Sequence, residues 1–340
     1  MKRTILIAIC VIVAIFLAKE VYESNFANRR VVVAYVTAGS DVVPDPSLMT
    51  HINYAFGHVA DSFDSLIISR PERLDQIVAL KAKNPKLKVL ISVGGWGSGN
   101  FSEMAADSTL RARFVQSCVA AVNRHNLDGV DIDWEYPTSS AAGISSSPDD
   151  THNFTLLMRD LRQALGHNDL LTFASVATAK YVDFPAVLPY LDFVNVMSYD
   201  MAVVPRHHSA LRATDDDYLT IEKAVQHHLD AGVPADKLVV GLAFYGKGTV
   251  RPERGAEMQA FITENALTEH WNEEGQYAYL TDSIGNVVYS FDNARSLAEK
   301  CRFANQKQLR GAMYWEYSRN DSTHNLSRAV WDVIMAEELK

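Results

Sequence analysis

The chain has 340 residues, enough for one large α/β barrel or for two smaller domains. Hydrophobic residues make up 48% of it and charged residues 21%, which is typical of a globular protein. Its formal net charge of -9 argues against nucleic acid or an anionic membrane surface as the main partner, because both would repel an acidic protein.

The N-terminus is predicted to be a targeting segment. Lys2 and Arg3 precede an apolar run, Ile5–Ala18, that is short for a membrane span but typical of the hydrophobic region of a signal peptide. Residues 1–26 are therefore interpreted as a signal peptide or an uncleaved signal anchor. In either case we expect residues 27–340 to be exported, and to be secreted, periplasmic or held at the membrane only by the N-terminus.

After residue 30, apolar strand-like runs alternate with amphipathic helix-like runs. The strand-like runs are Val31–Thr37, Ile52–Val59, Lys88–Val93, Leu127–Glu135, Leu171–Ala177, Phe193–Tyr199, Leu238–Tyr245 and Gly311–Trp315. The helix-like runs are Glu72–Lys83, Glu103–His125, Asp149–Gly166, Asp217–Ala231, Asn293–Gln306 and Ser327–Glu338. Eight strands rich in Val, Ile and Leu, with helices between them, predict an α/β fold of the (β/α)8 TIM-barrel type, and leave a doubly wound open sheet as the alternative.

A long connection separates the seventh strand from the helix before the eighth. Residues 248–291 contain a strand-like pair, Tyr277–Thr281 and Val287–Phe291, around a turn that includes Gly285. We interpret this segment as a short insertion in the barrel and not as a separate domain.

The fourth strand carries an unusual number of acids, in the stretch LDGVDIDWEYP (residues 127–137). Because strand side chains alternate between faces, Asp131, Asp133 and Glu135 lie on one side. Such crowded carboxyls cannot all ionise cheaply, so at least one proton is retained. Glu135 lies at the C-terminal end of the strand, where barrel active sites lie, and is predicted to stay protonated and act as a general acid, with Asp133 holding or passing the proton.

Two structural explanations compete with this prediction. A buried salt-bridge cluster needs basic partners, but the strands supply almost none that face inward. A metal site usually recruits histidine from neighbouring strands, whereas the pairs His207–His208 and His227–His228 fall in a loop and in a helix. We therefore expect neither a metal nor a cofactor.

Several segments resemble one family, in the correct order along the chain. LDGVDIDWE fits the DxxDxDxE signature of glycoside hydrolase family 18, the chitinases and their relatives. KVLISVGGW resembles the family's third strand, and HINYAFGHV, FVNVMSYD, GLAFYGKG and GAMYWEYSRND resemble its second, sixth, seventh and eighth. The resemblance covers most of the chain after residue 30 and favours the barrel over the open sheet.

The resemblance implies a substrate-assisted retaining mechanism, in which the N-acetyl group of the substrate is the nucleophile. Glu135 would protonate the glycosidic oxygen, and Asp133 would hold the acetamide N–H. Asp131 would share a proton with Asp133 in the empty site. Tyr199 would position the acetamide carbonyl. The supporting residues that it implies are Tyr35 and Ser92 beside Asp131, and Trp315 as the floor beneath the reacting sugar.

Further candidates for substrate binding lie at the strand ends. Asp200 suits a sugar hydroxyl, and aromatic or apolar side chains suit the apolar face of a pyranose ring. Lys247 is a candidate sugar contact at a position where the family often has arginine. The apolar candidates are Phe56, Trp96, Met197 and Tyr245.

The expected function is an exported chitinase that cuts β-1,4 links between N-acetylglucosamine units. The alternative is an endo-β-N-acetylglucosaminidase acting on the chitobiose core of N-glycans, which shares the mechanism and the motif. A non-catalytic lectin is disfavoured, because Glu135 occupies the position of the acid that inactive relatives typically lose. We expect a monomer whose partners are chitin or N-acetylglucosamine oligosaccharides and not nucleic acid.

Overall fold

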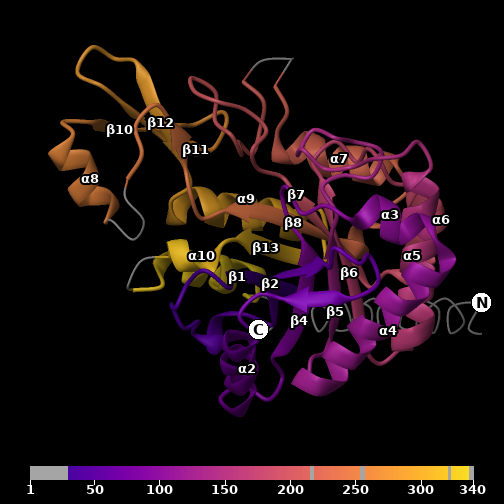
Figure 1. Ribbon diagram of the computed structural model, residues 1–340. Helices are drawn as coiled ribbons and strands as arrows, with labels where there is room; N and C mark the ends of the chain where they lie inside the picture. Colours follow the sequence, from indigo (N-terminus) through magenta and orange to yellow (C-terminus); the bar gives the residue numbers. More distant parts are fainter. Residues whose placement is uncertain (1–29, 215–217, 253–256, 321–322, 337–340) are drawn as a thin grey trace, which may run out of the picture.

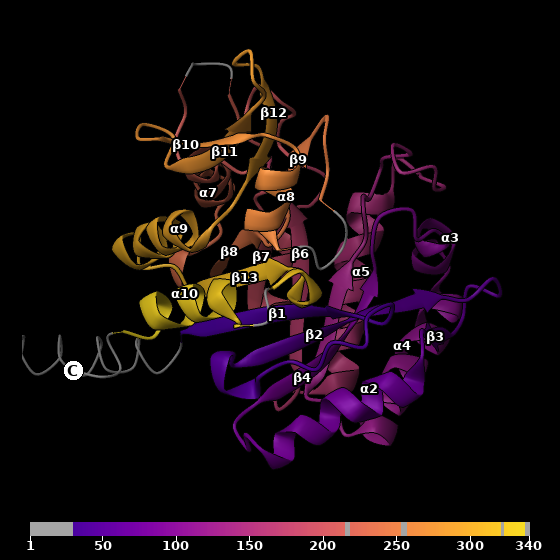
Figure 2. The same ribbon diagram turned by 90° about the vertical axis from the view of Figure 1, so that its left-hand side faces the viewer.

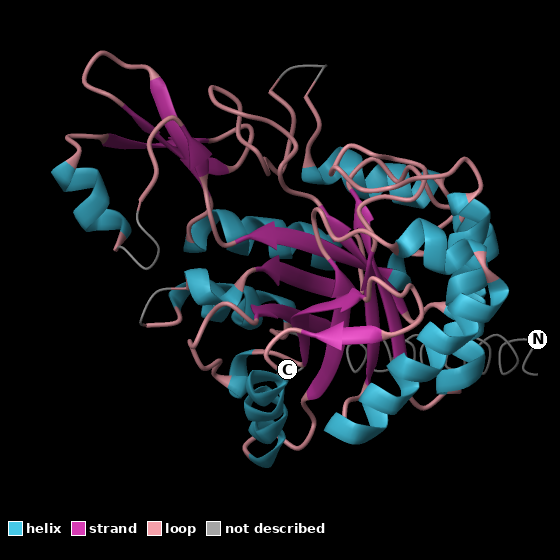
Figure 3. Ribbon diagram, viewed as in Figure 1, coloured by secondary structure: helices cyan, strands magenta, loops and turns pink. Residues whose placement is uncertain are grey.

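The computed structural model describes residues 30–214, 218–252, 257–320 and 323–336, so the predicted targeting segment lies outside the described residues. In these ranges a closed barrel of eight parallel strands is surrounded by helices (Figures 1 and 3). The barrel strands are β1 (Val31–Thr37), β2 (His51–Val59), β4 (Lys88–Gly94), β5 (Gly129–Asp133), β6 (Leu170–Val176), β7 (Phe193–Met197), β8 (Leu238–Ala243) and β13 (Gly311–Trp315). Because β1 pairs with both β13 and β2, the sheet closes, and the predicted barrel is confirmed over the open sheet.

Helices cover the outside of the barrel. The α-helices are α2 (Pro71–Val78), α3 (Phe101–Ala106), α4 (Ser108–His125), α5 (Asp150–Leu165), α6 (Phe184–Val187), α7 (Ile221–Asp230), α8 (Met258–Glu264), α9 (Ala294–Gln306) and α10 (Asn325–Ile334). Short 3-10 helices lie at Pro46–Leu48, Ala79–Ala82, Leu188–Tyr190, Ala235–Lys237 and Tyr317–Arg319. None of the helices in the described ranges is both long and apolar enough to span a membrane.

Several predicted elements differ from the structure in their bounds, and two of them bear on how the chain is built. The predicted helix Glu103–His125 is divided in two at Asp107, whose side chain accepts the backbone N–H groups of Thr109 and Leu110 and so begins a new helix. The predicted strand Leu127–Glu135 forms ladder pairs only over Gly129–Asp133, so Glu135 lies just beyond the strand end.

Alternation along β5 directs its acids into the barrel. Val130 and Ile132, together with Trp134 just after the strand, are fully buried against the helices in the main hydrophobic core, and the Trp134 ring stacks on Phe101 with centroids 5.2 Å apart. Burial of each such side chain is worth about 1.5–3 kcal/mol, so the strand cannot slip by one residue. The opposite face, with Asp131, therefore points to the barrel interior.

The connection after β8 forms a second, antiparallel sheet that stands off the barrel (Figures 1 and 2). Its strands are β9 (Lys247–Gly248), β10 (Thr268–Asn272), β11 (Tyr277–Thr281) and β12 (Val287–Phe291), in the order β10-β11-β12-β9. The predicted hairpin is confirmed with its bounds. Residues of β11 and β12 pack with α8 in a small hydrophobic core of their own, which includes Phe261, Leu280 and Tyr289.

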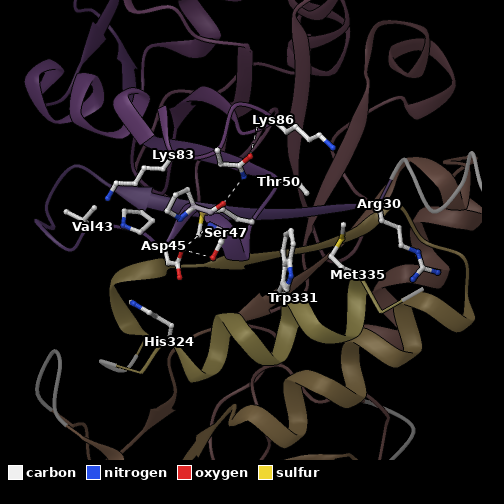
Figure 4. A pocket seen from close by; sticks show the side chains of 14 residues that line it. Arg30, Val43, Asp45, Ser47, Thr50, Lys83, Lys86, His324, Trp331 and Met335 are labelled. Carbon is white, nitrogen blue, oxygen red and sulfur yellow. Dashed lines mark hydrogen bonds between the residues drawn. The ribbon is translucent and has the colours of Figure 1, made fainter. Parts of the chain in front are cut away.

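A hollow of about 890 Å³ lies on the outside of the barrel, beside α10 (Figure 4). Trp331 points into it from α10, and Lys83 and Lys86 line its other side. The acids of β5 do not line this hollow. The carboxyl group that does line it, that of Asp45, accepts hydrogen bonds from the backbone N–H and the hydroxyl of Ser47. The candidate active site therefore lies elsewhere.

Candidate active site

A cavity of about 600 Å³ lies at the carboxyl ends of the barrel strands, where the active sites of such barrels are found. It brings together most of the side chains that the sequence singled out. Those that line it are Tyr35, Phe56, Trp96, Asp133, Glu135, Met197, Tyr199, Asp200, Tyr245, Lys247 and Trp315. The other two, Asp131 and Ser92, are fully buried beneath it.

Asp131 forms the floor of the acidic group and accepts four hydrogen bonds. Tyr35 and Ser92, each 2.8 Å away, donate to Oδ2. Thr172 (2.5 Å) and Asn195 (3.2 Å) donate to Oδ1. Sequence reasoning missed these two, although Asn195 is the one polar residue of β7. Burial raises the pKa of Asp131, and the four donors oppose the rise.

Asp133 lies above Asp131 and is almost completely buried. Its pKa is raised well above the usual value, first by burial and then by the negative charges of Glu135 and Asp131. Both oxygens of Asp131 accept hydrogen bonds from other donors, and the proton sharing with Asp133 stays a prediction. Among the described residues no donor reaches Asp133 Oδ1, which leaves a buried acceptor beside the cavity.

Glu135 is the outermost of the three acids. Burial raises its pKa to about 7; a hydrogen bond from the Tyr136 side chain opposes the rise, and the charge of Asp200 adds to it. Trp134, the residue before Glu135, stacks on Phe101 of α3, and this contact holds the backbone of Glu135 at the end of β5. At neutral pH a large fraction of Glu135 is protonated, as a general acid requires. Tyr136 also lines the cavity and was missed by sequence reasoning.

A polar group around Asp200 lines the same cavity as Glu135. Asp200 Oδ1 accepts from the Tyr245 hydroxyl at 2.6 Å and lies 2.8 Å from Lys247 Nζ. Burial alone would raise the pKa of Asp200, but hydrogen bonds from His208, Lys247 and Tyr245 outweigh it and hold the pKa well below the usual value. Asp200 is therefore ionised.

Aromatic rings supply the apolar surface of the cavity. Trp315 stacks on Phe56, with centroids 5.5 Å apart and planes at 22°, and meets Tyr35 at 5.7 Å. Tyr199 is packed near Met313, with its hydroxyl 4.0 Å from the Met313 sulfur. Trp96 is 63% exposed at the rim. Fixed rings of this kind bind sugars through the apolar faces of pyranose rings.

The cavity continues toward the insertion. A second cavity of about 750 Å³ shares Tyr245, Lys247 and Trp315 with the first. Its other side is lined by residues of the insertion, including Tyr289 and Met258. The insertion thus forms one wall of a cleft that leads away from the acids.

The donor set in the described ranges does not suit a metal ion. No group of three or more His, Cys, Asp or Glu side chains in those ranges is arranged to hold one. Instead, three stacked carboxyls, one of them half-protonated near neutral pH, lie in an aromatic-lined cleft at the end of a barrel. This combination defines a hydrolase that acts on carbohydrate by acid catalysis.

The chain belongs to the glycosyl hydrolases of family 18, whose family model matches residues 22–320. It is 33% identical to Chitinase A1 of Niallia circulans, over 89% of this chain and 50% of that protein. It is 30% identical to Probable chitinase 2 of Drosophila melanogaster, over 88% of this chain and 74% of the relative. The structure of a family 18 N-acetylglucosaminidase from Paenibacillus barengoltzii is 36% identical, with a TM-score of 0.80 over 89% of this chain and 99% of that one. The chain therefore spans about half the length of Chitinase A1 but nearly all of the last protein.

Proposed function

We propose that the protein is a chitinase that hydrolyses β-1,4-linked N-acetylglucosamine polymers by substrate-assisted retaining catalysis. The observation that carries the proposal is the free acceptor Asp133 Oδ1, buried in the same cavity as the protonatable carboxyl of Glu135. A buried acceptor without a donor is costly, and the acetamide N–H of a bound N-acetylglucosamine residue supplies that donor. The similarity to Chitinase A1 and to Probable chitinase 2 supports the same substrate.

In the first step, the Glu135 carboxyl donates its proton to the glycosidic oxygen and the bond from that oxygen to C1 breaks. The carbonyl oxygen of the substrate's acetamide forms a bond to C1 from the opposite face and gives an oxazolinium ion. Asp133 accepts the acetamide N–H and stabilises the positive charge that develops on the acetamide. Tyr199 orients the acetamide carbonyl, and Trp315 supports the reacting sugar from below.

In the second step, water replaces the leaving group. The Glu135 carboxylate now accepts a proton from the water, whose oxygen bonds to C1 as the bond from C1 to the acetamide oxygen breaks. Two inversions at C1 leave the product in the β-configuration. Asp131 takes no part in bond making and acts through its charge beneath Asp133.

A second candidate function is cleavage within N-glycans by an endo-β-N-acetylglucosaminidase. The similarity to the N-acetylglucosaminidase of Paenibacillus barengoltzii supports an N-acetylglucosaminidase activity as the alternative to chitin cleavage. A non-catalytic lectin is disfavoured by the intact acids. Residues 27–340 should be offered chitin oligosaccharides and an N-glycoprotein side by side, and the products weighed by mass spectrometry. Release of short N-acetylglucosamine oligomers from the first alone supports a chitinase, whereas trimming of the glycoprotein alone overturns it.

We also propose that residues 1–26 direct export and that the barrel acts as a monomer. The apolar run preceded by Lys2 and Arg3 supports export. Expression of the full chain followed by fractionation, with N-terminal sequencing of the product, distinguishes a cleaved signal peptide from an anchor. Retention in the cytoplasm would contradict export, and a dimer mass in light scattering would contradict the monomer.

A further inference from the structure

Asp200 has a backbone conformation that is disfavoured for any residue with a Cβ atom. Its φ is 60°, in the left-handed region. The side chain is also tied down, because Oδ1 faces both the Tyr245 hydroxyl and Lys247 Nζ. Those contacts leave the second carboxyl oxygen available to the cavity. Something in the surrounding structure must hold this conformation.

His208 lies directly behind Asp200 and is completely buried. Its Nδ1 is 3.4 Å from the Asp200 backbone nitrogen and 3.5 Å from Asp200 Oδ1, while Nε2 is 3.2 Å from the Tyr245 carbonyl oxygen. A carbonyl oxygen only accepts, so Nε2 carries a proton. Nδ1 thus faces both the backbone N–H and the carboxyl group of Asp200, and the ring links Asp200 to the backbone of Tyr245.

The chain around this ring is fixed to the base of the insertion. His207 accepts from the Ser209 N–H at Nδ1, so its Nε2 donates to the Phe291 carbonyl, both at 3.0 Å. Burial lowers the pKa of His207 to about 3, which keeps it neutral. Ser209 donates to Asp292 at 2.8 Å, and Asp292 forms a fully buried ion pair with Lys300. These contacts hold the backbone beside His208 against the base of the insertion.

We propose that His208 is a positioning residue for the hydrolytic reaction, which holds Asp200 so that its free carboxyl oxygen faces the substrate and its charge faces Glu135. The ring does not line the catalytic cavity, so it acts through Asp200 and Tyr245 and not on the substrate. The inference rests on the proposed function, because it concerns the same cavity.

Two conservative replacements distinguish the contribution of Nδ1 from that of Nε2. His208→Asn keeps a polar atom near the position of Nδ1, and His208→Gln keeps one near Nε2. We expect His208→Ala to lower kcat/KM on a soluble N-acetylglucosamine tetramer by about tenfold or more, because small displacements of aligned groups are costly. Asn should restore more activity than Gln. His227→Ala, an exposed histidine on α7, is the control and should leave kcat/KM unchanged.

A double-mutant cycle tests whether the effect passes through Asp200. In an Asp200→Asn background the further change His208→Ala should have little effect, since the charge to be positioned is already absent. Equal effects in both backgrounds, or wild-type kcat/KM in a folded His208→Ala variant, would overturn the proposal. If His208→Ala fails to fold, the Asn and Gln variants answer the question, and equal activities for those two would likewise count against it.

A measurement without substrate keeps this inference distinct from the proposed function. The titration of the Glu135 carboxyl, followed by infrared or NMR spectroscopy, should move to lower pH in His208→Ala, because the charge of Asp200 moves away. The groups that also titrate or carry charge around the ring are Asp200, Tyr245, Lys247, His207, Asp292 and Lys300. An unchanged Glu135 titration in His208→Ala would contradict the positioning role. Failure of the wild-type protein to cleave either chitin or the glycoprotein would refute only the proposed function.

Discussion

The hydroxyl group of Tyr35 on β1 donates to Asp131 Oδ2 on β5 at 2.8 Å, across the interior of the barrel. Thr172, on the neighbouring strand β6, reaches the other oxygen at 2.5 Å. Polar contacts between strands thus converge on one carboxyl in a place that hydrophobic side chains fill in other barrels. The contacts fix the charge that lies beneath Asp133.

Thr172→Val tests the energy of this arrangement. The change keeps the shape of the side chain but removes a donor to a buried carboxyl, so we expect a loss of about 1–3 kcal/mol in the free energy of unfolding. Unfolding by urea at neutral pH measures it. Thr109→Val, at an exposed position in the first turn of α4, should change stability much less. Equal stability of the two variants would mean that the contact from Thr172 to Asp131 contributes nothing measurable.

Glu135→Gln removes the proton donor and retains the shape of the side chain. We expect turnover to fall by about 10²-fold or more, while the protein stays folded because one of three crowded carboxyls becomes neutral. Asp128→Asn is the matched control, since Asp128 precedes the same strand but contacts Lys81 and Lys88 on the outside. That variant should lose some thermal stability and keep its turnover. Near-normal turnover by a folded Glu135→Gln protein would exclude Glu135 as the acid.

The pH profile follows from the raised pKa of Glu135. The acid must be protonated in the free enzyme, so kcat/KM should fall as the pH rises through about 7. The same raised pKa has a consequence for stability: the folded state holds this proton more tightly than the unfolded chain. The free energy of unfolding that this group contributes should be greatest below the usual carboxyl pKa and decline as the pH rises toward 7. Activity that kept rising well above that pH would contradict the assignment.

Sequence patterns predicted the elements whose signals are local. β1, β13 and the hairpin β11–β12 have the predicted bounds, because apolar runs and a glycine turn mark them. The division of a predicted helix at Asp107 was overlooked although its capping sequence was visible. Asn195 was visible as a polar residue in an apolar strand, but its contact with Asp131 was not predictable. The contact of Thr172 and the position of His208 were not predictable either, since the register between neighbouring strands and the return of a loop decide which side chains meet.

The role of the acetamide predicts a strict requirement in the substrate. Fully deacetylated chitosan should resist cleavage, because it lacks the acetamide carbonyl that acts as the nucleophile and offers Asp133 Oδ1 an amine in place of the acetamide N–H. A thiazoline analogue of the oxazolinium ion should inhibit, since analogues of reaction intermediates bind more tightly than substrates. NMR of the fresh product should show the β-anomer first. An initial α-anomer would require water to attack directly and would exclude the substrate-assisted route.

The positions of two tryptophans predict which of them binds substrate. Trp96 is exposed at the rim of the catalytic cavity and meets Tyr136 edge to face, with centroids 6.2 Å apart, so its ring is available to a sugar. Trp271, on β10 of the insertion, lies under the Arg295 guanidinium at 3.9 Å and lines neither cavity. We expect Trp96→Ala to raise KM for a soluble chitin derivative by about tenfold, on the scale of one lost aromatic contact.

Trp271→Ala should leave KM unchanged and reduce thermal stability, since it removes packing from the insertion. Initial rates over a range of substrate concentrations, with circular dichroism melting curves for both variants, measure the two effects. A rise in KM for Trp271→Ala alone would show that the substrate passes over the outer side of the insertion sheet, and the cleft between the insertion and the barrel would then not be its path.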